Sequence, residues 1–168
     1  MKRSSLTREI VELVMIALLL FGFVRFVWHG YHMQGSNMQP GIPSGASVMV
    51  NKASYLFSPP ARKDIIVFHY PFNTAQDVMA RVIGLPGDTI RTDSSHVWVN
   101  GSLLQETYVR TPFNPASREW KVPPNTYFVL NDNRQISDDS RNWDTLPRDF
   151  IIGKAVLIYW PASDWQML

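Results

Sequence analysis

The chain has 168 residues, of which 45% are hydrophobic and 12% aromatic, and its net charge is +2. This length and composition predict one packed domain with a short additional segment, and they exclude wholesale disorder. So small a net charge, without clustered Lys and Arg, argues against a nucleic-acid-binding protein. The chain contains no cysteine, which excludes disulfides, thiolate catalysis and cysteine-ligated zinc.

The N-terminal segment is long and apolar enough to cross a membrane. Residues 10–28 would form roughly 28 Å of helix, and the stretch from Leu13 to Val24 carries no charge. Lys2, Arg3 and Arg8 precede it, so the positive-inside rule places the N-terminus in the cytoplasm. No small-x-small site follows the apolar stretch, which favours an uncleaved anchor over a cleaved signal peptide or a buried core helix. We therefore expect a cytoplasmic N-terminus at residues 1–9, a lipid-contacting anchor at residues 10–28 and an extracytoplasmic domain at residues 29–168.

After the anchor the pattern changes from helical to extended. Short runs of alternating or β-branched residues, punctuated by Pro and Gly, predict strands. The predicted strands cover residues 48–50, 65–68, 78–83, 97–99, 127–130, 151–152 and 155–160. Asn100-Gly101 predicts a tight hairpin that pairs the strand before it with residues 103–104. Residues 105–126 are predicted to be a long surface excursion with at most one short strand, so we expect a mostly β domain.

Three polar stretches carry the functional signal. The first is Gly35–Pro40, the second is the Arg-Val-Ile-Gly-Leu-Pro-Gly-Asp run from Arg81 to Asp88, and the third runs from Asn131 to Arg141. Taken alone, the third stretch has the composition of a solvated turn. In their order and spacing, however, the three resemble the boxes of the type I signal peptidases, and the resemblance covers nearly the whole chain. It implies a signal-peptidase-type β domain of short strands, preceded by one transmembrane helix.

The resemblance also implies roles for single residues. In that family a serine of the first box is the nucleophile, and a lysine directly before the Arg-Val-Ile-Gly run is the general base. This chain has Asn37 and Ala80 at those two positions. By the resemblance Ser137 would be the hydrogen-bond partner of the lysine amine, left without it here, and Arg81 would pair with Asp139. The matching positions, which would shape the substrate groove, are Gly35, Ser36, Met38, Pro40, Arg81, Asp132, Asn133, Arg134, Asp139, Ser140 and Arg141.

The two replaced positions predict a loss of catalysis. A carboxamide is no multiple-turnover nucleophile, a methyl group accepts no proton, and removing a serine nucleophile lowers the rate on the order of 10⁶-fold. Ser36 is adjacent to the nucleophile position, but neighbouring side chains of an extended segment point to opposite faces. Lys52, Lys63 and His69 lie in other segments and are no obvious replacement base. The sequence thus predicts a pseudoenzyme.

We therefore expect an inactive, membrane-anchored homologue of signal peptidase I that acts as an assembly factor or chaperone for exported surface subunits. Degenerate members of the family assist pilus assembly in Gram-positive bacteria, and the compact length resembles the Gram-positive form. The expected partner is an exported polypeptide or pilin subunit, with its signal peptide as one of the segments that could be bound as an added strand. No cofactor, metal or nucleic acid is expected. The alternatives are an active type I signal peptidase with displaced catalytic groups, which processes signal peptides during protein secretion, and a folded remnant that binds nothing.

Overall fold

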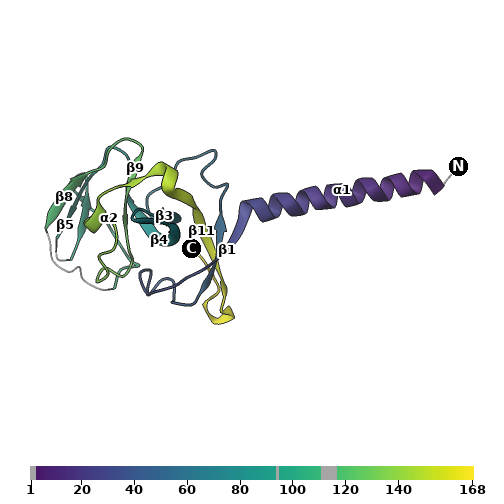
Figure 1. Cartoon of the computed structure of the whole chain (residues 1–168). Coiled ribbons are helices and arrows are strands. Elements are labelled where there is room, and N and C mark those ends of the chain that lie inside the picture. Colours follow the sequence, from purple (N-terminus) through teal and green to yellow (C-terminus); the bar gives the residue numbers. More distant parts are fainter. Residues whose placement is uncertain (1–2, 94, 111–116) are drawn as a thin grey trace.

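The computed structural model describes residues 3–93, 95–110 and 117–168. Helix α1 (Arg3–Val27) projects as a single rod from a β domain (Figure 1). Its Thr7–Val27 portion is long and apolar enough to cross a membrane, with a mean hydropathy of 2.5. Its side chains from residue 7 to residue 26 are exposed, as expected for a helix whose packing partner is lipid. The helix ends at Val27, and Trp28, which the sequence places in the anchor, begins the first strand.

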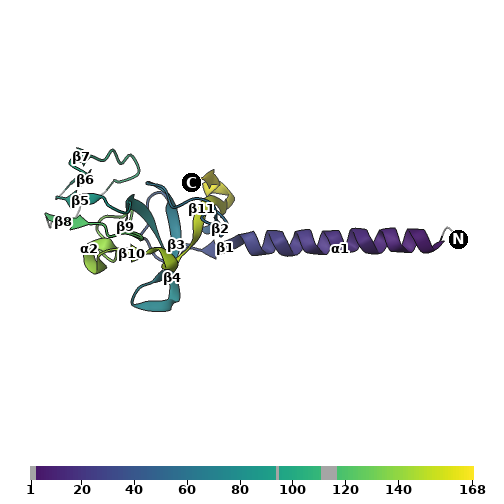
Figure 2. The ribbon, with the colours of Figure 1, turned by 90° about the horizontal axis from the view of Figure 1, so that it is seen from above.

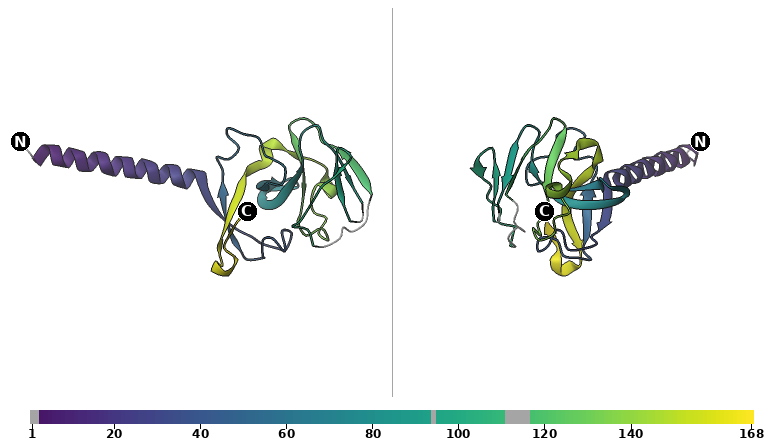
Figure 3. Two further views of the ribbon diagram at one scale, coloured as in Figure 1. Left: turned by 180° about the vertical axis from the view of Figure 1, so that it is seen from behind. Right: turned by 60° about the vertical axis from the view of Figure 1, so that its left-hand side comes forward.

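Two antiparallel sheets form the β domain. The larger sheet has the order β1 (Trp28–His32), β2 (Ser47–Asn51), β11 (Ile151–Trp160), β3 (Ile65–Tyr70), β4 (Asn73–Gly84), β9 (Thr126–Leu130) and β10 (Leu146–Pro147), with β12 (Gln166–Met167) paired to β11. The smaller sheet has the order β7 (Ser102–Leu103), β6 (Val97–Val99), β5 (Thr89–Thr92) and β8 (Arg118–Lys121). The short helices are α2 (Ser140–Trp143), η1 (Arg148–Phe150) and η2 (Ala162–Asp164). The smaller sheet lies at the end of the domain away from α1 (Figures 2 and 3).

The prediction of a mostly β fold preceded by one apolar helix is confirmed. Every predicted strand is present, and the Asn100-Gly101 hairpin pairs Trp98 with Leu103. The predicted excursion contains one strand, β8, within the part that the structure describes, while residues 111–116 lie outside it.

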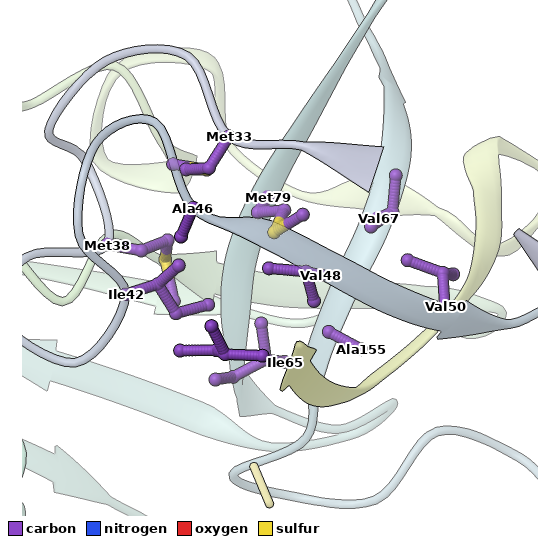
Figure 4. Close-up of a cluster of buried hydrophobic side chains, with 11 residues drawn as sticks. Met33, Met38, Ile42, Ala46, Val48, Val50, Ile65, Val67, Met79 and Ala155 are labelled. Carbon is purple, nitrogen blue, oxygen red and sulfur yellow. The ribbon is translucent and has the colours of Figure 1, made fainter. Parts of the chain in front are cut away.

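The core divides on either side of β3 and β4, because successive residues of a strand point to opposite faces. One cluster joins Val67 and Met79 to the segment that connects β1 with β2, including Met38 and Ile42 (Figure 4). The other cluster contains Ala80, one residue further along β4. Met79 and Ala80 are therefore neighbours in sequence that pack into different cores.

Gly84 ends β4 at the junction between the two sheets. A Cβ atom there would lie 2.9 Å from the Ile90 side chain and 2.9 Å from the Phe128 Cβ. Contacts this short do not occur in relaxed structures, so the position requires a residue without a side chain.

We expect Gly84→Ala to lower the free energy of unfolding by about 1–3 kcal/mol, because the added methyl group overpacks this junction. Urea denaturation of the full chain in detergent micelles, followed by near-ultraviolet circular dichroism, measures the change. Gly22→Ala is the matched control, since a Cβ at Gly22 meets nothing within 4 Å. Equal stability of the two variants would contradict the prediction.

Candidate functional site

The segment Gly35–Pro40 forms a turn in the connection between β1 and β2. Gly35 has φ of 93°, in the left-handed region where glycine is favoured. The amide of Gln39 donates to the carbonyl of Ser36 at 3.2 Å, and Met38 is fully buried in the core cluster beneath. This anchoring leaves Ser36 and Asn37 half-buried at the surface of the turn.

The third polar stretch fastens this turn from the other side. The backbone N–H of Asn133 donates to the carbonyl of Asn37 at 2.9 Å. The Asn133 side chain donates to the carbonyl of Ser36 at 3.2 Å. Two segments that are almost one hundred residues apart are thus held in register.

Asn37 lies on the wall of a cavity beside this turn. The cavity has a volume of about 470 Å³, and its walls include Asn37, Met79 and Asn131. Asn37 Nδ2 donates to the carbonyl of Met79 at 2.8 Å, and it lies 3.5 Å from Asn131 Oδ1. The Asn131 side chain is fixed in turn, because its amide nitrogen donates to the carbonyls of Ile136 and Asp138 at 3.2 Å each.

Ala80 and Ser137 do not share this wall. Ala80 is 1% exposed and packs in the core cluster that contains Phe68 and Val82. Ser137 is exposed on the surface loop between β9 and α2. The catalytic roles that the resemblance implies for Asn37, Ala80 and Ser137 stay predictions.

Arg81 forms a bidentate salt bridge near the site, and its partner differs from the predicted one. Its Nε and Nη2 atoms donate to the two oxygens of Asp132 at 2.8 and 2.6 Å. Burial lowers the pKa of Arg81, but the hydrogen bonds and charge of Asp132 outweigh it, so the pKa is raised. The predicted pairing with Asp139 is wrong because strand register decides the matter: Arg81 stands opposite Leu130, and Asp132 follows two residues later.

Asp139 has a different task, which is to fix the end of its own loop. It accepts from the backbone N–H of Arg141 at 3.0 Å and so caps helix α2. It also pairs with the Arg141 guanidinium at 2.7 Å and accepts from the N–H of Asn131 at 3.0 Å. The neighbouring Ser140 accepts from the N–H of Val129 at 3.0 Å, so these residues hold the loop against β9.

Glu106 and Tyr108 belong to the site's supporting network but were missed in the sequence, because their segment was taken for a surface excursion. Arg134 is fully buried and pairs with Glu106 at 2.6 Å. The ring of Tyr108 lies 3.9 Å beneath the Arg81 guanidinium, and the Tyr108 hydroxyl donates to Glu106 at 2.7 Å. Burial, with the negative charge of Glu106, raises the pKa of Tyr108. A buried arginine needs an acidic partner. This requirement was the one signal in the sequence that an acid such as Glu106 belongs to the network.

Tyr31 and His69 also lie at cavity walls that the sequence did not reveal. The Tyr31 hydroxyl donates to the carbonyl of Asp77. Burial, and then the charge of Asp77, raises the pKa of Tyr31 to about 12. His69 Nδ1 lies 2.7 Å from the Asp77 carboxylate, beside a second cavity of about 170 Å³. Among the residues that the structure describes, no group of three or more His, Asp or Glu side chains is arranged to hold a metal ion.

The sequence matches the family described as "Signal peptidase, peptidase S26" over residues 6–160. A relative from Synechocystis sp., named "Probable signal peptidase I-1", is 37% identical and covers 96% of this chain and 86% of its own length. "Signal peptidase I" of Bacillus caldolyticus is 38% identical, with coverage of 83% and 84%. The crystal structure of a signal peptidase I from Enterococcus faecalis is similar with a TM-score of 0.52 and 33% identity, over 58% of this chain and 97% of that one.

These relatives correct two predictions. The prediction of an inactive assembly factor is wrong, because relatives that match most of the chain are named signal peptidase I. The prediction that the protein is not an enzyme is wrong for the same reason. The relatives favour the alternative, an active peptidase. None of the relatives described above is named for pilus assembly. The apolar helix α1 and these relatives together indicate a membrane-anchored protein.

We expect Arg81→Ala to lower the free energy of unfolding by about 3–5 kcal/mol, because it leaves the buried carboxylate of Asp132 without its partner. Arg118→Ala is the matched control: Arg118 pairs with Asp144 at the surface, where both side chains are more than half exposed, and its loss should change stability by less than about 1 kcal/mol. Urea titration of both variants in micelles measures the difference. A loss from Arg81→Ala no larger than that of the control would contradict the role given to this pair.

Proposed function

Because the chain belongs to the signal peptidase family, peptidase S26, we propose that it is a type I signal peptidase that cleaves signal peptides from exported precursor proteins. The observation that carries the proposal is the extent of the match: relatives named signal peptidase I correspond to 83–96% of the chain. The match therefore includes the apolar helix and the segments that wall the cavity. Precursors of surface subunits such as pilins fall within the proposed substrate class.

Strand β4 offers a binding edge for an extended substrate. On one side it pairs with β3 along most of its length. On the other side β9 pairs only with the end of β4, from Arg81 to Gly84. The edge of residues 73–80 thus has no strand partner among the described residues, and Gln76 to Met79 line the cavity beside it. A polypeptide in extended conformation binds such an edge as an added strand.

The cleavage step needs a nucleophile and a base, and Asn37 and Ala80 supply neither. The proposal places the step on Ser47 and His32, which stand opposite each other in the pairing of β1 with β2. His32 lines the cavity, and its Nδ1 lies 3.5 Å from Ser47 Oγ. Catalytic hydrogen bonds of unliganded enzymes are often long and tighten when substrate binds. In this assignment Ser47 Oγ attacks the scissile carbonyl, His32 takes its proton and passes it to the leaving amine, and water then hydrolyses the acyl-enzyme.

We expect the purified full chain in detergent micelles to release the mature part of a precursor that carries an Ala-x-Ala sequence before its cleavage site. Ser47→Ala and His32→Gln should each lower the turnover rate at least 10³-fold, because either change removes a group required for attack. Ser44→Ala, which removes an exposed hydroxyl from the preceding turn, should leave the rate unchanged. Electrophoresis of the products measures the outcome.

Two results of this assay separate the function from the residue assignment. Absence of product with the unaltered chain would contradict the proposed activity. Product that disappears in Ser36→Ala but persists in Ser47→Ala would keep the activity and transfer the nucleophile to Ser36.

We further propose that residues 10–27 span the cell membrane, with residues 1–9 in the cytoplasm and the β domain, which begins at Trp28, outside it. The support is the cluster of basic residues before the apolar stretch. Because the chain has no cysteine, single cysteines report topology without background.

A membrane-impermeant maleimide should label Ser102→Cys in intact cells, since Ser102 is exposed in the β domain. It should label Ser5→Cys only after the cells are permeabilised. Mass-shift electrophoresis reads both variants, and the reverse labelling pattern would contradict the orientation.

A further inference from the structure

The binding edge of β4 is already occupied by two side chains of the same chain. The hydroxyl of Tyr31 donates to the backbone carbonyl of Asp77. The amide of Asn37 donates to the backbone carbonyl of Met79 at 2.8 Å. All four residues line the cavity of about 470 Å³.

These two carbonyls are the acceptors that an added strand would use. Asp77 and Met79 are two residues apart, so their carbonyls point to the same edge, about 7 Å from each other. Val82 exchanges backbone hydrogen bonds with Lys63 and Asp64, just before β3. Because the bonding direction alternates along an antiparallel strand, the carbonyls of Asp77 and Met79 point to the opposite edge, which β9 leaves unpaired at these residues. The backbone amides of alternate residues in an incoming peptide have the same spacing and would need the same two oxygens.

We propose that Tyr31 and Asn37 hold the β4 edge closed, and that an extended peptide binds there only by displacing their two hydrogen bonds. The inference rests on the proposed function, because it takes the substrate to bind at this edge. It gives the Asn37 amide a physical task, donation to the Met79 carbonyl, that alanine at that position could not perform.

The setting of both donors supports this exchange. Tyr31 is half-buried, and burial raises its pKa to about 12, so its phenol is a neutral donor at neutral pH. Asn37 has a second acceptor in Asn131 Oδ1, 3.5 Å away, so its amide is not left without a partner when a peptide takes the Met79 carbonyl. Displacement therefore leaves both β4 carbonyls hydrogen-bonded, now to the peptide, and its penalty is the bond that each of the two side chains gives up.

The proposal is tested by peptide affinity. The probe is a fluorescein-labelled twelve-residue peptide that ends at the last alanine of an Ala-x-Ala sequence, which leaves no bond to cut. Its Kd for the full chain in micelles is measured by fluorescence anisotropy. Tyr31→Phe and Asn37→Ala should each lower Kd about fivefold, because each frees one backbone acceptor. The double variant should lower it about twentyfold if the two effects are nearly additive.

Matched controls remove the same groups elsewhere. Tyr159→Phe deletes the hydroxyl of an exposed tyrosine, and Asn142→Ala deletes an exposed amide on α2; both should leave Kd unchanged. Tyr31→Phe retains the ring and its packing, so it tests the proposal independently if Asn37→Ala folds poorly. Unchanged near-ultraviolet circular dichroism confirms that both variants fold.

Each outcome decides the matter. Tighter binding by the variants, including binding by variants where the unaltered chain shows none, supports the proposal. Equal or weaker binding by the variants, with normal precursor cleavage by the unaltered chain, overturns the closed edge and leaves the proposed function standing. Absence of peptide binding by every chain overturns the closed edge, and failure of precursor cleavage as well overturns the proposed function.

Discussion

The bidentate pair between Arg81 and Asp132 ties strand β4 to the loop after β9, and the geometry of the site depends on this tie. Asp132 is fully buried, and a charge removed from water must be paired. The next residue, Asn133, holds the carbonyls of Ser36 and Asn37. Any movement of the Asp132 carboxylate would therefore move the turn that carries Asn37. The ring of Tyr108 packs against the Arg81 guanidinium at 3.9 Å, which adds a second contact that orients it.

The strands were predictable because they depend on local pattern, whereas the contacts of the site depend on register. The Asn100-Gly101 turn fixes its own hairpin, and the alternation in β4 separates the environments of Met79 and Ala80. The choice of Asp132 over Asp139 as the partner of Arg81 follows from the offset between β4 and β9. No local pattern encodes that offset.

The functional prediction failed for a related reason. It considered Ser36 as a replacement nucleophile and Lys52, Lys63 and His69 as replacement bases. It judged them by their position in the sequence, although the same chemistry recurs wherever a hydroxyl and a base meet in the right geometry. Ser47 and His32 are separated by a long connection, and only the pairing of β1 with β2 brings them face to face. Residue-by-residue transfer of roles along aligned boxes has no means of finding such a couple. The match of whole chains to relatives named signal peptidase I carries information that two positions do not.

A long strand with one unpaired edge is a hazard as well as a binding site, since it invites pairing with any extended chain. In β4 this edge borders a cavity of about 470 Å³. Tyr31 and Asn37 bind the carbonyls of Asp77 and Met79 and so remove two of the acceptors that indiscriminate pairing would need. A peptide that also gains side-chain contacts in the cavity can offset the loss of these two bonds and bind. A peptide that offers only its backbone binds this edge weakly. Closing an edge with side chains, and not with another strand, thus makes recognition depend on the side chains of the substrate.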